Sequence, residues 1–325
     1  MTKAPIVLLG LLLAGSVIAD DAEHWLEKMD RAAQTLSYQG DFVFLRGHRM
    51  RHMQAQQLID DSGVHLRIIA VDGPAAKLVA TRSGTASAAE GYYQNPPARR
   101  DILFPSAVPS RLIGLRSFYS FSLAGTGRVA DRPTRIIDAK PNDDFRFGFR
   151  LWADNESGLL LKVAMVNTQG EAVEQFSFSR IDMNPDRQQL AESIFAESPV
   201  ADPVVMNQGG AIEQLPWEVT AIPSGFSLQG VRRTVDERQR PVDHLIYSDG
   251  LATVSVFIEP LKESRGGQQT RSTARIAGIT AMTDVIADNQ VTVIGEVPAA
   301  TLRLIMNSVK APETAVTLVA GGGND

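Results

Sequence analysis

Two histidines four residues apart, His48 and His52, have the spacing at which side chains on one helix face share a metal ion. No glutamate lies between them to complete a zinc-hydrolase motif. The neighbouring Arg46, Arg49 and Arg51 would repel a cation. The sequence therefore predicts a basic segment and no metal site. This segment is a candidate contact for an anionic ligand, such as the head group of a lipid.

Ser248, in the tripeptide Ser-Asp-Gly, is the second candidate for a catalytic side chain, as a nucleophile. A serine nucleophile needs a base within hydrogen-bond reach, and the chain has no Gly-x-Ser-x-Gly elbow around this residue. His244 is four residues away, which is about 13 Å along an extended strand. No orienting acid or oxyanion hole is recognisable nearby. We interpret the tripeptide as a turn and predict no catalytic residue and no enzymatic activity.

Acidic and glycine pairs give no further catalytic or cofactor site. The aspartates of the pairs 60–61 and 143–144 are adjacent, so in a strand they point to opposite faces and make poor acid–base couples. The glycine pair 266–267 lacks the lysine of a phosphate-binding loop. We therefore expect no cofactor and no nucleotide.

Composition limits the class of protein. The chain has 325 residues, no cysteine and a formal net charge of -5, so nucleic acid is not an expected partner. Residues 1–19 have one lysine, a short apolar run and small residues before Asp20, which predicts a secretory signal peptide. About 306 residues would remain after cleavage, which favours two domains. Residues 46–135 carry 13 Lys or Arg against 6 Asp or Glu, a basic segment in an acidic protein.

The first half of the chain predicts one helix followed by many strands. Apolar residues recur at helical spacing over Asp21–Leu36. The segment around Phe42 and Phe44 predicts a strand that is apolar on both faces, and residues 64–71 and 77–81 predict two more. We interpret residues 83–110, which lack periodicity, as long loops.

Alternating apolar residues between 144 and 181 predict a three-stranded antiparallel meander. Phe145, Phe147, Phe149 and Leu151 are expected on one face of its first strand. Two interpretations of the aromatic stripes stay open: they are ordinary core, or they line a cavity for an acyl chain. The candidate lipid-binding phenylalanines are Phe42, Phe44, Phe147, Phe149, Phe176 and Phe178.

A second domain follows a segment rich in Pro and Gly. The apolar runs on either side of Ser248 predict a hairpin, with Val254, Val256 and Ile258 on one face of the returning strand. The stretch 291–298 predicts another strand, and Pro298 favours the start of a final helix.

The hairpin sequence YSDGLATVSVFIEP and the later VTVIGEVP resemble the C-terminal domain of the RseB/MucB family. Upstream, RFGFRLWAD and GRVADR are similar to family patterns, with phenylalanine in place of tyrosine and Asp131 in place of a glycine. The resemblance covers nearly the whole mature chain. Members of this family are periplasmic regulators of the sigma-E envelope-stress response.

The resemblance implies an α+β fold of two mostly antiparallel β domains. The first would be a LolA/LolB-like curved half-barrel sheet packed on helices, and the second a smaller antiparallel sheet with a helix. The implied division is a signal peptide at 1–19, an N-terminal domain at 20–198, a linker at 199–215, a C-terminal domain at 216–310 and a disordered tail at 311–325.

The resemblance also implies a function. The protein would be a periplasmic negative regulator that binds the periplasmic domain of a RseA/MucA-like transmembrane anti-sigma factor and protects it from regulated proteolysis. Lipopolysaccharide or lipoprotein acyl chains would release the partner, and the protein could self-associate. The alternative is a LolA-like carrier of lipid or lipoprotein. The candidate partner-binding residues are His244, Tyr247, Asp249, Leu251 and Phe257.

Overall fold

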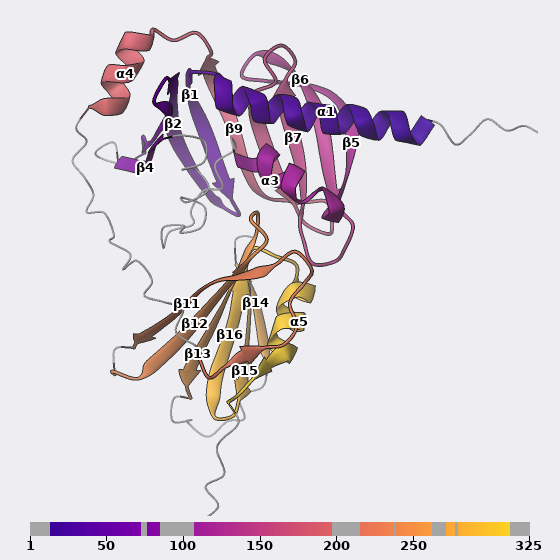
Figure 1. The fold of residues 1–325 in the computed structure, drawn as a ribbon, viewed down its shortest axis with the longest axis vertical. Helices are drawn as coiled ribbons and strands as arrows, with labels where there is room; N and C mark the ends of the chain where they lie inside the picture. The colour runs from indigo at the N-terminus through magenta and orange to yellow at the C-terminus, as the bar shows by residue number, and fades with distance from the viewer. Residues whose placement is uncertain are drawn as a thin grey trace, which may run out of the picture.

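A computed structural model of the chain describes residues 14–72, 77–84, 107–196, 215–236, 238–261, 271–276 and 279–312. Two large antiparallel sheets lie end to end in the molecule, the first with several helices and the second with α5 (Figure 1). The expected fold class, α+β with two mostly antiparallel β domains, is therefore confirmed.

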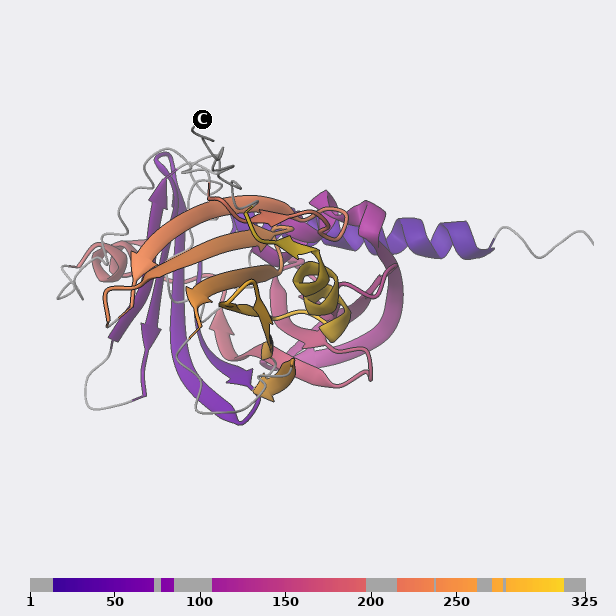
Figure 2. The same cartoon turned by 90° about the horizontal axis from the view of Figure 1, so that it is seen from below.

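The first sheet has nine strands in the order β4-β3-β2-β1-β9-β8-β7-β6-β5. Every neighbouring pair is antiparallel. Strands β1 to β4 lie side by side in chain order, and so do β5 to β9; the two groups meet where β1 pairs with β9. Figure 2 shows the strong curvature of these strands, and Figure 1 shows the first helix crossing the sheet. The elements are α1 Ala14–Thr35, β1 Tyr38–Arg46, β2 Arg49–Asp60, β3 Gly63–Ala70, β4 Lys77–Gly84, α3 Val108–Gly114, the 3-10 helix Arg116–Phe118, β5 Tyr119–Val129, β6 Arg132–Pro141, β7 Gly148–Asp154, β8 Leu160–Val166, β9 Ala172–Asp182 and α4 Arg187–Phe195.

The core of this unit lies between α1 and the curved sheet. Leu26 and Met29 of α1 recur at helical spacing and are buried against strand residues such as Phe42 and Leu151. We expected β1 to be apolar on both faces. Only the face that carries Phe42 and Phe44 is buried, and Leu45 on the other face is exposed. One face of the sheet therefore covers the core while the other meets solvent.

The second sheet has six strands in the order β11-β12-β13-β16-β15-β14. The elements of this second domain are β10 Glu218–Val219, β11 Ser227–Val235, β12 Pro241–Ser248, β13 Thr253–Pro260, β14 Ser272–Ile276, β15 Ile279–Ile286, β16 Asn289–Gly295, α5 Ala299–Ser308 and β17 Val309–Lys310. The short strands β10 and β17 pair with each other in a separate two-stranded sheet. The predicted hairpin is confirmed as β12–β13, and Val254, Val256 and Ile258 are buried on one face as expected. Leu302 and Ile305 of α5 pack against that same face.

Two local predictions were wrong. Phe145 and Phe147 precede β7 and lie in an irregular segment, so the alternating pattern extended the strand too far upstream. The loop prediction for 83–110 was wrong at both ends, because β4 continues to Gly84 and α3 begins at Val108; residues 85–106 lie outside the described residues. The meander β7–β8–β9 itself is confirmed. Asp131 has a φ of 60° in the β5–β6 turn, a left-handed conformation that explains the family's glycine there.

The predicted signal peptide, linker and tail fall largely on residues 1–13, 197–214 and 313–325, outside the described residues. The predicted first helix exists but begins earlier, at Ala14. Of the helices in the described part of the chain, none is both long enough and apolar enough to span a membrane.

Candidate functional site: a polar joint between the two sheets

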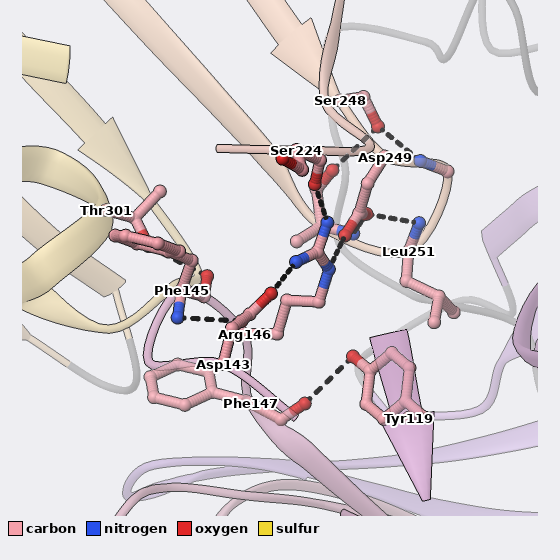
Figure 3. A network of polar contacts seen from close by, with 12 residues as sticks. Tyr119, Asp143, Phe145, Arg146, Phe147, Ser224, Ser248, Asp249, Leu251 and Thr301 are labelled. Atoms are coloured by element: carbon pink, nitrogen blue, oxygen red, sulfur yellow. Dashed lines mark hydrogen bonds and ion pairs between the residues drawn. The ribbon is translucent and has the colours of Figure 1, made fainter. Parts of the chain in front are cut away.

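A buried arginine in the segment before β7 of the first domain lies at the centre of the contact with the second domain (Figure 3). Arg146 precedes β7, and its side chain is 1% exposed. Its Nε donates to the Asp249 carboxylate over 3.0 Å. The two remaining guanidinium nitrogens donate to the Asp143 carboxylate and to the carbonyl of Ser224. A single guanidinium thus joins its own loop to two turns of the second domain, in the multidentate geometry that arginine favours.

The Ser-Asp-Gly turn positions the carboxylate that Arg146 binds. Asp249 Oδ1 accepts hydrogen bonds from the backbone N–H groups of Leu251 and Ala252 over 2.9 and 2.8 Å. This local pattern is the reason that aspartate favours turns. Gly250 has a φ of 96°, which a glycine adopts without strain. The second oxygen of Asp249 therefore points away from its own turn and toward Arg146.

Aromatic rings enclose the same guanidinium. Its central carbon lies 4.2 Å from the ring centroid of Phe118 and 5.3 Å from that of Phe226, which allows cation–π attraction from both domains. Gly225, with a φ of 85°, lets the backbone approach so closely that a Cβ there would stand 2.7 Å from both Arg146 and Phe118. Tyr119 donates to the carbonyl of Phe147 over 3.0 Å, and burial raises the pKa of its hydroxyl.

A second ion cluster also links the two domains. Arg46 Nη2 lies 2.7 Å from Glu174 Oε2 in the first sheet and 2.8 Å from Glu296 Oε1 in the second domain. Burial raises the pKa of Glu174 to about 7, and the Glu296 charge adds to this effect, whereas Arg46 opposes it. The carboxyl group therefore titrates near neutral pH.

A third contact and a small pocket complete the joint. The hydroxyl of Thr301, in α5, donates to the carbonyl of Phe145 over 2.7 Å. The pocket between the ion clusters has a volume of about 20 Å³, room for one water molecule. Its lining residues include Phe147, Phe149, Glu174 and Glu296.

Most of the candidate lipid-binding phenylalanines pack against one another in the core. The Phe42 and Phe176 ring centroids are 4.5 Å apart, and those of Phe176 and Phe178 are 5.0 Å apart in an edge-to-face arrangement. Phe44 is buried beside them, and Phe147 and Phe149 line the pocket of the joint. In the structure these side chains are buried, and the pocket of the joint, with about 20 Å³, is too small for an acyl chain.

The basic candidates separate into two groups. Arg49 and Arg51 of β2 are exposed, whereas Arg46 is held by the two glutamates of the joint. His48 and His52 lie on a hairpin and not on a helix, and His52 contacts Asp72. Within the described ranges, no group of three metal-ligating side chains occurs.

The candidate partner-binding residues lie in three different places. Asp249 and Leu251 belong to the joint, and Tyr247 is buried in the second core. His244 and Phe257 lie side by side on the opposite face of the second sheet, where their rings stack with centroids 4.0 Å apart. Both side chains are partly exposed on that face.

The sequence reasoning missed Arg146, Glu174 and Glu296. Arg146 lies in a run of phenylalanines, and a charged residue inside an apolar run signals a buried partner. Its partner is 103 positions away, so no local pattern could identify it.

The fold and the site together define a class: a two-domain antiparallel β protein whose domains are joined by buried ion pairs. Comparison with known proteins makes the assignment specific. The family model of the MucB/RseB N-terminal domain matches residues 21–197, and that of the MucB/RseB C-terminal domain matches residues 211–310. The chain therefore belongs to the MucB/RseB family.

Individual relatives agree with this assignment. The chain is 31% identical over 320 residues to the sigma factor AlgU regulatory protein MucB of Pseudomonas aeruginosa, covering 97% of this chain and 98% of the relative. It is 26% identical over 290 residues to the sigma-E factor regulatory protein RseB of Escherichia coli strain K12, covering 88% and 89%. A crystal structure of MucB in complex with MucA(peri) is similar with a TM-score of 0.66 and 27% identity, covering 90% of this chain and 100% of that one.

Proposed function

We propose that this protein is a periplasmic negative regulator of a sigma-E-type envelope-stress response. It binds the periplasmic domain of a MucA- or RseA-like anti-sigma factor and shields that domain from regulated proteolysis. The observation that supports this best is the match of both family domains, together with the similarity to MucB bound to MucA(peri). Such a role needs binding and no chemical step.

The proposed location and domain division follow from the same family assignment. The predicted signal peptide at 1–19 directs export, and a chain without cysteines needs no disulfide in that compartment. We propose an N-terminal domain at 20–198, a linker at 199–215, a C-terminal domain at 216–310 and a tail at 311–325. Self-association stays a prediction that size-exclusion chromatography with light scattering would test.

We place the partner site on the face of the second sheet that α5 does not cover. His244 and Ile246 of β12, Phe257 of β13 and Ile294 of β16 alternate with core residues and are half-buried there. A β-sheet face with several partly exposed apolar side chains suits an apolar segment of a partner. The stacked pair of His244 and Phe257 is the centre of this proposed surface.

We propose that an anionic lipid, lipopolysaccharide or a lipoprotein, releases the partner. Arg49 and Arg51 are exposed, and we propose that they contact a phosphate or carboxylate head group. The pocket of the joint, with about 20 Å³, is too small for an acyl chain. We propose that the acyl chain enters the first domain in a different conformation. The lipid would release the partner by binding that conformation more tightly than the partner-bound one.

A binding assay with and without lipid tests the proposal. The immobilised periplasmic domain of the anti-sigma factor should retain the protein, and lipid A should elute it. Arg49→Glu with Arg51→Glu should raise the lipid concentration needed for release, while Arg128→Glu, on the exposed β5 edge, serves as the charge-matched control. If the protein ignores the anti-sigma domain but retains lipid during purification, it is a LolA-like carrier instead.

A further inference from the structure

A turn of the second domain places an apolar side chain against the core of the first domain. Leu251 lies in the turn between β12 and β13, and it packs against the first core. Figure 3 shows its side chain directed from the turn toward the ring of Tyr119. The small pocket of the joint is lined by Leu251 and Ala252 from the second domain and, among others, by Phe149 and Met165 from the first. Leu251 therefore borders apolar side chains of the other domain.

The contact lies at one end of the curved first sheet. Strand pairing forms a row of four residues across β7, β8, β9 and β1 near that end: Phe149, Met165, Glu174 and Arg46. The next row inward on the same face is apolar and buried: Leu151, Val163, Phe176 and Phe44. Arg49 pairs with Arg46, so an exposed arginine of the proposed lipid contact lies at this end too. The second domain thus covers the end of the sheet at which the aromatic stripe begins.

The same turn presents a carboxylate close to the apolar side chain. Asp249 Oδ2 accepts from Arg146 Nε over 3.0 Å, and both side chains are 1% exposed. Leu251 follows two positions later, and both residues contact the first domain. A carboxylate bound to an arginine, beside an aliphatic group in apolar surroundings, has the chemistry of a bound anionic amphiphile with its head group and tail.

Hydrogen bonds within the turn fix these two groups relative to each other. Asp249 Oδ1 accepts from the N–H groups of Leu251 and Ala252. Ser248 Oγ donates to the carbonyl of Ala252 over 2.6 Å and accepts from the N–H of Gly250 over 3.0 Å. Because the turn is held by its own contacts, its carboxylate and its apolar side chain leave the first domain together when the second domain moves away.

Such a movement would leave Arg146 with one of the three acceptors described above. Asp143 precedes it in the same segment, whereas Asp249 and the carbonyl of Ser224 belong to the second domain. A guanidinium presents its donors in a planar fork that suits a carboxylate or a phosphate. An anionic head group at this place would restore the contacts that the second domain supplies.

We propose that the turn 248–252 is an internal mimic of an anionic acyl ligand, in which Asp249 occupies the site of the head group and Leu251 the entrance for the tail. An acyl chain with a carboxylate or phosphate head group binds at Arg146 after the turn has withdrawn. Ligand binding and domain docking therefore exclude each other at this end of the sheet. This inference rests on the proposed release by lipid and names the groups that compete with the lipid.

The strength of the competition follows from the burial of Leu251. Full burial of a leucine side chain favours the buried state by roughly 10- to 150-fold. Leu251 is partly buried, so the lower end applies. A ligand that needs the withdrawn turn binds more tightly by the factor that docking loses. Leu251→Ala should therefore bind an acyl ligand about tenfold more tightly.

Titration of a fluorescent fatty acid into the full mature chain tests the mimic. The probe is cis-parinaric acid, a carboxylate whose polyene chain fluoresces in apolar surroundings. Leu251→Ala and Asp249→Asn should each lower its Kd by about tenfold or more. Two exposed changes serve as controls and should leave the Kd unchanged: Val235→Ala, at the end of β11 far from the turn, and Asp138→Asn, in the pair with Arg150.

The head-group assignment is tested by two ligands of equal chain length. Dodecanoate should displace the probe at a concentration at least about tenfold lower than dodecanol, because Arg146 binds the carboxylate. Arg146→Met should remove most of this preference. Equal displacement by the acid and the alcohol in the unchanged protein overturns the assignment, so the test does not depend on the folding of the Arg146→Met variant.

A distance measurement tests whether the ligand displaces the turn. The sequence has no cysteine, and Glu23→Cys on α1 and Arg303→Cys on α5 are exposed sites for spin labels, one in each domain. Saturation with dodecanoate should add a second population to the distance distribution measured by pulsed EPR. An unchanged distribution with the ligand bound overturns the proposal.

The outcomes separate this inference from the proposed release by lipid. If neither Leu251→Ala nor Asp249→Asn binds the probe more tightly, the mimic is wrong, even where lipid A elutes the protein from the anti-sigma domain. If both variants bind the probe more tightly while lipid A elutes nothing, the mimic stands and the proposed release fails.

Discussion

The change Asp249→Asn tests whether the buried ion pair stabilises the joint. Asparagine is isosteric and its oxygen can still accept from the N–H groups of Leu251 and Ala252, so the turn should persist. The change removes the negative charge that faces Arg146 over 3.0 Å, where both side chains are 1% exposed. Breaking such a buried pair costs about 3–5 kcal/mol. We expect the lower end, about 3 kcal/mol, because Arg146 keeps Asp143 as a partner.

Urea unfolding followed by tryptophan fluorescence measures this effect, since Trp25 and Trp152 pack against the first core and Trp217 belongs to the second. A loss of about 3 kcal/mol corresponds to roughly a 100-fold change in the unfolding equilibrium. Asp138→Asn, in an exposed pair with Arg150, should cost less than about 1 kcal/mol.

A double variant excludes a merely local effect of the asparagine. Arg146→Met leaves the Asp249 carboxylate buried without its guanidinium partner, and adding Asp249→Asn should then recover part of the stability. If the losses of the two single variants simply add, the carboxylate and the guanidinium are not energetically coupled and the reasoning fails.

Three further changes test the packing around the joint and the second core. Gly225→Ala should destabilise by about 2 kcal/mol or more, because its φ is 85° and a Cβ would meet Arg146 at 2.7 Å; calorimetry that shows an unchanged melting temperature would contradict this. Thr301→Val should cost about 1–2 kcal/mol in urea unfolding, since it leaves the carbonyl of Phe145 without its donor, and a neutral result would mean that water replaces the hydroxyl. Leu302→Ala should cost about 2–5 kcal/mol by opening a cavity in the second core, against about 0.5 kcal/mol for the exposed Arg303→Ala.

Periodic segments were predictable from sequence because their patterns are local. The β12–β13 hairpin follows from alternation around a Ser-Asp-Gly turn, and Val254 and Val256 are buried as that alternation requires. The final helix was predicted to start at Pro298, and it begins at Ala299. In these elements the side that is buried depends only on spacing, so sequence suffices.

The joint was not predictable, because its partners come from distant positions. Asp249 was predicted to lie in a turn, and its Oδ1 does accept from the turn backbone. Its other carboxylate oxygen, Oδ2, binds Arg146, which is 103 positions earlier. Alternation predicted that Phe147 lies in a strand. Residues 145–147 instead precede β7, and Arg146 among them contacts the second domain. Arg46 was expected to contact an anionic ligand, which stays a prediction; in the structure it contacts Glu174 and Glu296 of the same chain.

The central claim is that the protein recognises the periplasmic domain of a MucA- or RseA-like anti-sigma factor. Isothermal titration of that domain into the full-length mature protein tests it most directly. We predict a saturable complex that His244→Ala with Phe257→Ala weakens, while Arg303→Ala, at an exposed position of α5 on the other side of the sheet, does not. The absence of measurable heat at any protein concentration, with no complex in a parallel size-exclusion run, would contradict the account.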